Sequence, residues 1–222
     1  MRRIVLFIAA VLGAWSITCH GQTLPESAPR KLTIANRPWT GDFDRMLERR
    51  MIRVYAPFSR SLYFADKGRE RGIAVELVRD WERYLNIKHA TALGKRPLTI
   101  YIAPATRDKL LPDLADGLAD VAIGNLTVTD ERLKQVDFVP GDEGRKTISE
   151  VVVTGPKSPE LKSLDDLSGK TVHVRKASSY YESLEKQNEK LKKDGKPPIA
   201  FVVVPDSLED EDLMEKIGRA HV

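Results

Sequence analysis

The stretch ADVAIGNLTVTDER, residues 119–132, decides how the chain is interpreted, because it joins an apolar run to a group of anion-binding residues. The run ADVAIG predicts a short buried strand. Arginine carries a permanent charge and binds a carboxylate through two parallel N–H groups. Thr127, Thr129 and Arg132 are therefore candidates for an anion site at the end of this strand. In the alternative interpretation, Thr129 caps a short helix and Arg132 lies on the surface beside Asp137.

The sequence before this stretch alternates between strand and helix patterns. Apolar runs rich in β-branched residues predict strands at 50–58, 98–105 and 119–124. A helix is predicted from Thr106 to Gly117, a typical start and stop pair. This order predicts a parallel sheet with flanking helices. The segment GIAVELVRDWERYLN predicts a further helix, whose apolar residues near helical spacing are Ile73, Leu77, Val78, Trp81 and Leu85.

A second alternating series follows, and it begins with a predicted strand at 149–155. SLDDLSGK predicts a short helix with a capping box between Ser163 and Asp166, and TVHVRKA and IAFVVVPD predict strands. In the helix SSYYESLEKQNEKLKKDG, Ser179 and Glu182 are expected to form another capping box. Two consecutive α/β series predict two lobes around a ligand site. The segments GNLTVT and RKASSY each follow a strand, where ligands of open α/β sheets bind.

The N-terminus predicts export from the cytoplasm. A short basic segment, MRR, precedes the apolar run IVLFIAAVLGAWSIT, which is typical of a secretory signal peptide. An uncleaved membrane anchor and a lipid-bearing Cys19 are the alternatives, and either would produce membrane association. Cys19 is the only cysteine, so a disulfide framework is excluded and the periplasm is the expected location. The proline-rich residues 22–42 are expected to be a linker.

Composition and motifs exclude several other functions. The 36 basic and 32 acidic residues are interleaved along the chain, which argues against a nucleic-acid partner. The four histidines lie in unrelated segments without metal-ligand spacing, and no nucleotide-binding or nucleophile motif is present. We therefore expect no metal, no cofactor and no catalytic residue in this chain. The acidic segment LEDEDLMEK is interpreted as the first turn of a helix, stabilised by the helix dipole.

The stretch DVAIGNLTVTDERLKQVDF resembles the signature of the type II periplasmic solute-binding proteins of family 3, which include receptors for polar amino acids. The resemblance implies a two-lobed α/β fold in which Thr127 and Arg132 grip the carboxylate of a ligand. The segment LDDLSGKTVHVRKASSY is similar to the opening of the second lobe in that family, and this implies that Ser178 and Ser179 contact the same anion. Tyr63 is the candidate for an aromatic wall beside the ligand, with a core position as the alternative.

A narrower resemblance extends over residues 41–216. The segments GDFDRMLERRMIRV, SRSLYFADKGRERG, VRKASSYYESL and LEDEDLMEK are together similar to the N-terminal solute-binding domain of the membrane-bound lytic murein transglycosylase F family. This resemblance implies a sensing domain for an amino acid or a muropeptide-like ligand, with a C-terminal transglycosylase domain as its partner. The alternatives are the receptor of an amino-acid ABC transporter, with a permease as its partner, and a periplasmic dehydratase on the same fold.

The chain departs from the family pattern at its end. The final IGRAHV matches a reading frame of a common sequencing adapter, so the second lobe is expected to be truncated. The carboxylate that receives the amino group of a ligand in this family is expected to be missing, and neither Asp206 nor Asp210 is assigned that role. Marginal stability and an exposed apolar edge on IAFVVVP are expected. The expected domains are a signal peptide at 1–21, a linker at 22–42, a first lobe at 43–147, an incomplete second lobe at 148–216 and a non-native tail at 217–222.

Overall fold

The computed structural model describes residues 37–139 and 147–219 of the 222-residue chain. The expected signal peptide, most of the linker and the last residues of the expected tail lie outside the described residues. Within the described ranges, no helix has the length and apolar character needed to cross a membrane. In chain order the elements are α1 (Phe43–Arg49), β1 (Met51–Pro57), β2 (Phe64–Asp66), β3 (Arg69–Arg71), α2 (Ile73–Lys88), α3 (Ala90–Leu93), β4 (Thr99–Ala105), α4 (Arg107–Ala115), β5 (Val121–Ala122), α5 (Asp130–Leu133), the 3-10 helix η1 (Leu164–Leu167), β6 (Thr171–Arg175), α6 (Ser179–Lys193), β7 (Ala200–Val204) and α7 (Asp210–Arg219).

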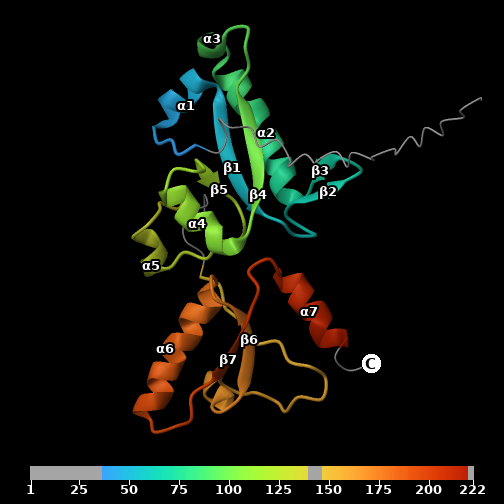
Figure 1. The fold of residues 1–222 in the computed structure, drawn as a ribbon, viewed down its shortest axis with the longest axis vertical. Helices are drawn as coiled ribbons and strands as arrows, with labels where there is room; N and C mark the ends of the chain where they lie inside the picture. Colours follow the sequence, from blue (N-terminus) through green and yellow to red (C-terminus); the bar gives the residue numbers. More distant parts are fainter. Residues whose placement is uncertain (1–36, 140–146, 220–222) are drawn as a thin grey trace, which may run out of the picture. The chain divides into compact units, whose positions relative to one another are not determined.

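Three strands form a parallel sheet in the order β4–β1–β5, as the alternating pattern predicts (Figure 1). Ile52 of β1 is paired with Ile100 of β4, and Val54 is paired with Ile102 of β4 and with Val121 of β5. The central strand β1 has neighbours on both edges, and most of its residues are buried. Burial on both faces explains why this strand has a nearly continuous apolar sequence.

Helix α2 packs against this sheet through an apolar side centred on Val78. The sequence-based assignment of that side was partly wrong, because Ile73 and Leu77 are 60% and 58% exposed. Both residues lie roughly 100° or more around the helix from Val78, outside the stripe that faces the sheet. The residues of α2 that do contribute to the core are Ala74, Val75, Val78, Trp81 and Leu85.

A fully buried arginine lies within β1, where the sequence pattern predicts only an apolar strand. The side chain of Arg53 is 0% exposed, and it forms an ion pair with Asp120 at 2.6 Å. Its guanidinium also donates to the carbonyl oxygens of Arg37, Trp39 and Gly117. Each buried donor of Arg53 needs an acceptor. Its acceptors lie at the start of the described chain and in the segment before β5, so Arg53 connects these two segments.

Strands β6 and β7 form a second, separate parallel sheet. Val174 of β6 and Ile199, just before β7, pack with Leu184 and Leu191 of α6 in a second hydrophobic cluster, which also includes Leu167 of η1. Two predictions are confirmed here: η1 begins with the Ser163–Asp166 capping box, and β6 and β7 are strands. The exposed apolar edge is also present, since Val202 and Val203 of β7 are 41% and 53% exposed.

Two segments differ from the predicted elements. Residues 149–155 were expected to form a strand, but they form no strand, and Val151 and Val153 are 78% and 52% exposed. A strand requires a hydrogen-bonded neighbour, and β6 and β7 pair only with each other among the described residues. The segment after β1 contains a β2–β3 hairpin that was not predicted. Lys67 and Gly68 make its tight turn, and both have positive φ.

Asp165 of η1 joins this short helix to α6 and to the loop before β7, and its contribution to stability is expected to depend on pH. Hydrogen bonds from Lys190, and then from Lys196 and Gln187, hold the pKa of Asp165 well below its usual range. A carboxyl with a lowered folded pKa stabilises the protein at neutral pH, and this contribution is lost as the pH falls below its unfolded value of about 3.9.

We therefore predict that Asp165→Asn lowers the free energy of unfolding at pH 7, and that the difference from the wild type shrinks as the pH falls toward 2. Urea unfolding at a series of pH values measures this difference. Glu131→Gln is the control, because Glu131 lies in an exposed ion pair with Lys134 and should show a smaller effect. A difference that is constant with pH would contradict the prediction.

Candidate functional site

A cavity of about 230 Å³ lies where strands of both sheets end. Its walls include residues that follow β5, residues at the β6–α6 junction and residues at the start of α7. These are the strand-end positions where ligands of α/β proteins bind. The volume is below the ~300–1,000 Å³ of drug-sized ligand sites, so a small occupant is expected. The cavity is lined by Ser61, Leu62, Arg107, Asn125, Leu126, Thr127, Arg132, Ile148, Arg175, Ala177, Ser178, Ser179, Tyr180, Glu209, Asp210 and Glu211.

A larger hollow of about 500 Å³ lies at the opposite ends of the strands, beside Met51 of β1 and Thr99 of β4. These are the first residues of the two strands, so the hollow is at their amino ends. Arg49 and Trp39 form part of its wall, and the Arg49 guanidinium carbon lies 3.6 Å from the centre of the Trp39 ring. None of the residues predicted to bind a ligand lines this hollow, so we assign the candidate site to the smaller cavity.

Arg132 is buried in the wall of the smaller cavity, at 7% exposure. Its Nε donates to Glu182 Oε1 at 3.1 Å, and its two terminal nitrogens donate to the carbonyl oxygens of Thr127 and Ala177 at 3.1 and 3.3 Å. The surface position beside Asp137, which the sequence left open, is therefore not observed. Buried and held on three sides, the guanidinium has a fixed orientation.

The hydrogen bonds of Arg132 leave part of its binding capacity unused. A guanidinium has five N–H donors, and three of those of Arg132 have acceptors among the described residues. The remaining two are one N–H on each terminal nitrogen. The guanidinium therefore keeps two N–H donors besides its contact with Glu182, and a carboxylate is an acceptor suited to such donors.

Ser178 and Ser179 are both buried in the cavity wall at the start of α6. The predicted cap is shifted by one residue: Ser178, not Ser179, is the N-cap, and its hydroxyl accepts from the backbone N–H of Tyr181. Glu182 forms no capping box because its carboxylate faces Arg132. The first backbone N–H groups of a helix have no intrahelical acceptors, so this end of α6 provides donors for an anion.

The remaining predicted residues have different positions. Thr127 lines the cavity. Thr129 is the N-cap of α5 and accepts from the backbone N–H of Arg132, as the capping alternative states. Tyr63 is 8% exposed within the core of the first sheet, where its ring contacts Phe58 and its hydroxyl donates to Glu70. The structure therefore brings together Thr127, Arg132, Ser178 and Ser179, but it does not place Tyr63 in the cavity wall.

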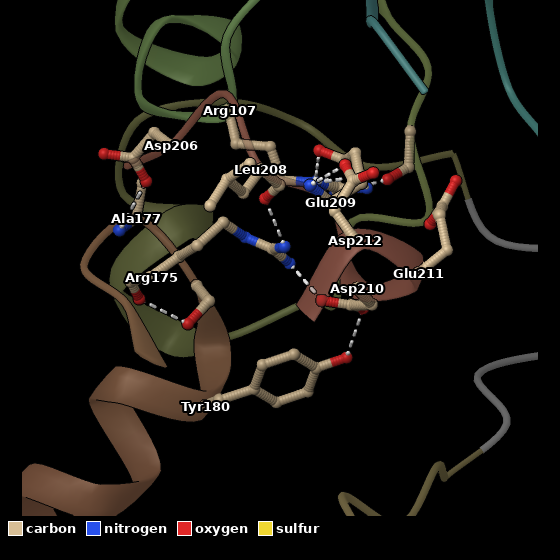
Figure 2. Close-up of polar contacts among 12 residues, drawn as sticks. Arg107, Arg175, Ala177, Tyr180, Asp206, Leu208, Glu209, Asp210, Glu211 and Asp212 are labelled. Carbon is tan, nitrogen blue, oxygen red and sulfur yellow. Dashed lines mark hydrogen bonds and ion pairs between the residues drawn. The ribbon is translucent and has the colours of Figure 1, made fainter. Parts of the chain in front are cut away.

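Arg107 and Glu209 form a buried ion pair at the cavity, and Figure 2 shows their contacts. Nε of Arg107 lies 2.9 and 3.0 Å from the two carboxylate oxygens of Glu209, and Nη2 lies 2.6 Å from Oε2. The fourth contact of Arg107 runs from Nη1 to the carbonyl oxygen of Gly124 at 2.6 Å. Burial is the largest single effect and lowers the pKa of Arg107, but the hydrogen bond and the charge of Glu209, together with the charge of Asp210, outweigh it, so the pKa is raised. This pair fixes the start of α4 to the residue before α7.

A second ion pair, between Arg175 and Asp210, lies at the end of β6 (Figure 2). Nη2 of Arg175 lies 2.5 Å from Asp210 Oδ1, and Nη1 donates to the carbonyl oxygen of Leu208. The hydroxyl of Tyr180 donates to the other oxygen of Asp210 at 3.3 Å. Burial and then the charge of Asp210 raise the pKa of Tyr180, so this hydroxyl stays a donor at neutral pH.

Sequence reasoning missed the charged residues of these two pairs. Arg175 is the last residue of β6 and Arg107 comes two residues after the end of β4, so the strand-end rule applied to the arginines would have found them. The acidic residues were interpreted only as the first turn of a helix. Asp206, which was also left unassigned, accepts weakly from the backbone N–H of Ala177 and does not line the cavity. Arg107 and Glu209 are 102 residues apart in the sequence, and only the fold brings them into contact.

Comparison with known proteins gives a match to one family. Residues 51–197 match the model of the bacterial extracellular solute-binding proteins, family 3. The L-cystine-binding protein TcyJ of Escherichia coli (strain K12) is 30% identical over 133 residues, which cover 59% of this chain and 43% of that protein. The match thus extends over less than half the length of this curated relative.

Solved structures share the fold at lower identity. The arginine-bound form of a truncated arginine-binding protein, ArgBP from T. maritima, superposes with a TM-score of 0.55 at 23% identity, over 81% of this chain and 74% of that one. A putative L-cystine ABC transporter protein from Listeria monocytogenes gives a TM-score of 0.51 at 21% identity, over 76% of this chain and 66% of that one. These likenesses confirm that the chain has the α/β fold of type II solute-binding proteins. The superposed residues cover part of each solved chain.

Proposed function

Because this chain belongs to the bacterial extracellular solute-binding proteins, family 3, we propose that it binds an amino acid or a small peptide-like anion. Arg132 anchors the carboxylate of the ligand, and Thr127 and the start of α6, with Ser178 and Ser179, contact the same group. The family is extracellular by description, so we place the domain in the periplasm. Tyr63 is not part of this proposal, since its side chain lies in the core.

The observation that carries the proposal is the state of Arg132. It is buried at 7% exposure in a cavity wall, it is held by Glu182, Thr127 and Ala177, and two of its N–H groups lack acceptors among the described residues. A buried charge is costly unless it is paired and hydrogen-bonded. A ligand carboxylate would complete the hydrogen bonding of this guanidinium.

We propose further that the domain is the sensing arm of a cell-wall lytic transglycosylase. This is supported by the segments that resemble that family along residues 41–216. Binding of an amino acid or a muropeptide would then regulate a C-terminal catalytic domain. A second candidate, the receptor of an amino-acid ABC transporter, is favoured by the match to the L-cystine-binding protein. The complete gene separates the two: a downstream lysozyme-like domain with a catalytic glutamate selects the sensor, and its absence selects the receptor.

Titration calorimetry tests whether the protein binds amino acids at all. The full chain is titrated with a panel of L-amino acids and dipeptides, and with the corresponding amino-acid amides as controls. We expect saturable binding of at least one amino acid and weaker binding of its amide, because the amide lacks the carboxylate that Arg132 binds. Saturable binding of an amide with the same affinity as the free acid would contradict the carboxylate anchor.

A further inference from the structure

We propose that the larger hollow, at the amino ends of β1 and β4, is a second binding site, and that it binds a phosphomonoester, a group with close to two negative charges. Four of its lining residues are arginines: Arg37, Arg49, Arg50 and Arg96. Within the described part of the chain, no carboxylate lines it. The hollow lies at the opposite ends of the strands from the cavity of Arg132, so this inference goes beyond the function proposed above.

The protein neutralises the positive charge of this hollow only in part. Arg49 forms an ion pair with Asp120 at 2.6 Å, but the same carboxylate also pairs with the fully buried Arg53. One carboxylate therefore serves two guanidinium groups. Burial, the largest effect, lowers the pKa of Arg49, and the charge of Arg53 lowers it further, whereas Asp120 opposes both. An anion bound in the hollow would compensate the remaining positive charge.

The four arginines also have unused hydrogen-bond donors. In contacts with other described residues, Arg37 and Arg96 take part only through their carbonyl oxygens, and their guanidinium groups are unpaired there. Nη1 of Arg50 donates to two carbonyl oxygens, which leaves its Nε and Nη2 available. Arg49 uses Nε and Nη2 for Asp120 and a carbonyl oxygen, which leaves Nη1. Each lining arginine can therefore still donate to a ligand.

The walls of the hollow are fixed by contacts that do not use these free donors. The carbonyl oxygens of Arg37 and Trp39 accept from the buried guanidinium of Arg53, which holds the first wall. Nη1 of Arg50 donates to the carbonyl oxygen of Arg96, which holds the loop before β4. A site that is formed before the ligand arrives loses less conformational entropy on binding.

The volume and the lining indicate the class of ligand. The volume of about 500 Å³ lies within the ~300–1,000 Å³ of small-molecule sites, so there is room for an organic group beside the anion. Trp39, Met51 and two prolines supply an apolar part of the wall. Guanidinium groups match phosphate oxygens in geometry. A phosphomonoester has three acceptor oxygens and a charge of about −1.5 to −2, which suits several arginines better than the single charge of a carboxylate.

The test compares two esters of nearly the same shape, phenyl phosphate and phenyl sulfate, of which the sulfate has a single negative charge. Titration calorimetry uses the full chain at about pH 7.5, where a phosphomonoester has close to two charges. We expect the wild type to bind phenyl phosphate about tenfold more tightly than phenyl sulfate, because the second charge also interacts with the arginines. Equal affinities for the two esters would overturn the inference.

Arg37→Gln and Arg96→Gln should each weaken the binding of phenyl phosphate by about tenfold, because each removes a charged donor. Neither substitution removes a side-chain hydrogen bond to another described residue, so both proteins should fold. Arg45→Gln is the matched control, since Arg45 is an exposed arginine of α1 that pairs with Glu48 and does not line the hollow. An affinity unchanged in both test variants would overturn the inference.

A further variant and a vesicle assay complete the test. Loss of phenyl phosphate binding in Arg132→Ala but not in Arg96→Gln would place the anion in the other cavity and overturn the inference. Sedimentation with phosphatidylcholine vesicles, with and without phosphatidic acid, identifies the source of the phosphomonoester. Binding that phosphatidic acid increases and Arg96→Gln weakens indicates a lipid head group, and binding of phenyl phosphate without this increase indicates a soluble ligand. If neither probe binds, the inference fails, and the amino-acid site at Arg132 is unaffected.

Discussion

Replacing Arg132 with alanine is expected to weaken the binding of an amino-acid ligand by about 2–5 kcal/mol, the usual cost of truncating one partner of a desolvated charge pair. The side chain is 7% exposed, so water cannot replace the guanidinium as the partner of a ligand carboxylate at full strength. The substitution also removes the donors to Thr127 and Ala177. Titration calorimetry with the best ligand from the amino-acid panel measures the loss.

Two further variants separate the role of the arginine from a general disturbance. Arg132→Lys keeps the charge but loses the paired N–H groups, so we expect an affinity between those of the wild type and the alanine variant. Arg60→Ala is the matched control, because Arg60 is a 67% exposed arginine that pairs with Asp212 and Glu215 and does not line the cavity. An affinity unchanged in Arg132→Ala, with the protein folded by circular dichroism, would remove Arg132 from the site.

Asp120→Ala is expected to lower the free energy of unfolding by about 3–5 kcal/mol, the range found when one partner of a buried ion pair is removed. The carboxylate of Asp120 accepts from the backbone N–H, Nε and Nη2 of Arg53, and also from Nη2 of Arg49. Without it, the charge of Arg53 stays fully buried with only carbonyl oxygens as acceptors. Urea unfolding of both proteins measures the change.

The exposed pair of Arg45 and Glu48 is the control for this measurement. Their side chains are 70% and 65% exposed, so Glu48→Ala should change the free energy of unfolding by only about 0–1 kcal/mol. Asp120→Asn tests the charge separately, since asparagine keeps one acceptor oxygen and should cost less than alanine. A loss below 1 kcal/mol in Asp120→Ala would mean that Arg53 finds another partner or reaches water when the carboxylate is gone.

Most helices and strands could be predicted from the sequence because they depend on neighbours along the chain. The apolar runs of β1, β4 and β7, the end of α4 two residues before Gly117 and the capping box of η1 all involve residues within one or two turns of each other. The predicted strand at 149–155 failed because a strand depends on a distant partner. The valines at 151–153 resemble a strand, but they form none because no described strand pairs with them.

In the candidate site, too, some residues could be predicted from the sequence and others could not. The motif around Arg132 was recognised because its threonines and arginine are close in sequence, and the strand-end rule placed Ser178 and Ser179 near it. The family resemblance also made Tyr63 a candidate, but the hairpin that follows it and the packing of α2 place its ring in the core. The ion pairs of Arg107 with Glu209 and of Arg132 with Glu182 join residues 102 and 50 positions apart, and no local pattern specifies them.

The sequence alone therefore determined the alternating α/β elements and the family signature, and it made Arg132 a candidate for the site. These features are determined by periodicity, caps and short spacings, which act between residues close along the chain. Only the tertiary structure decided which charges face that arginine and which carboxylates reach the cavity. A buried charge must find its partner in space, and the partner can come from any segment that the folded sheets bring within hydrogen-bonding distance.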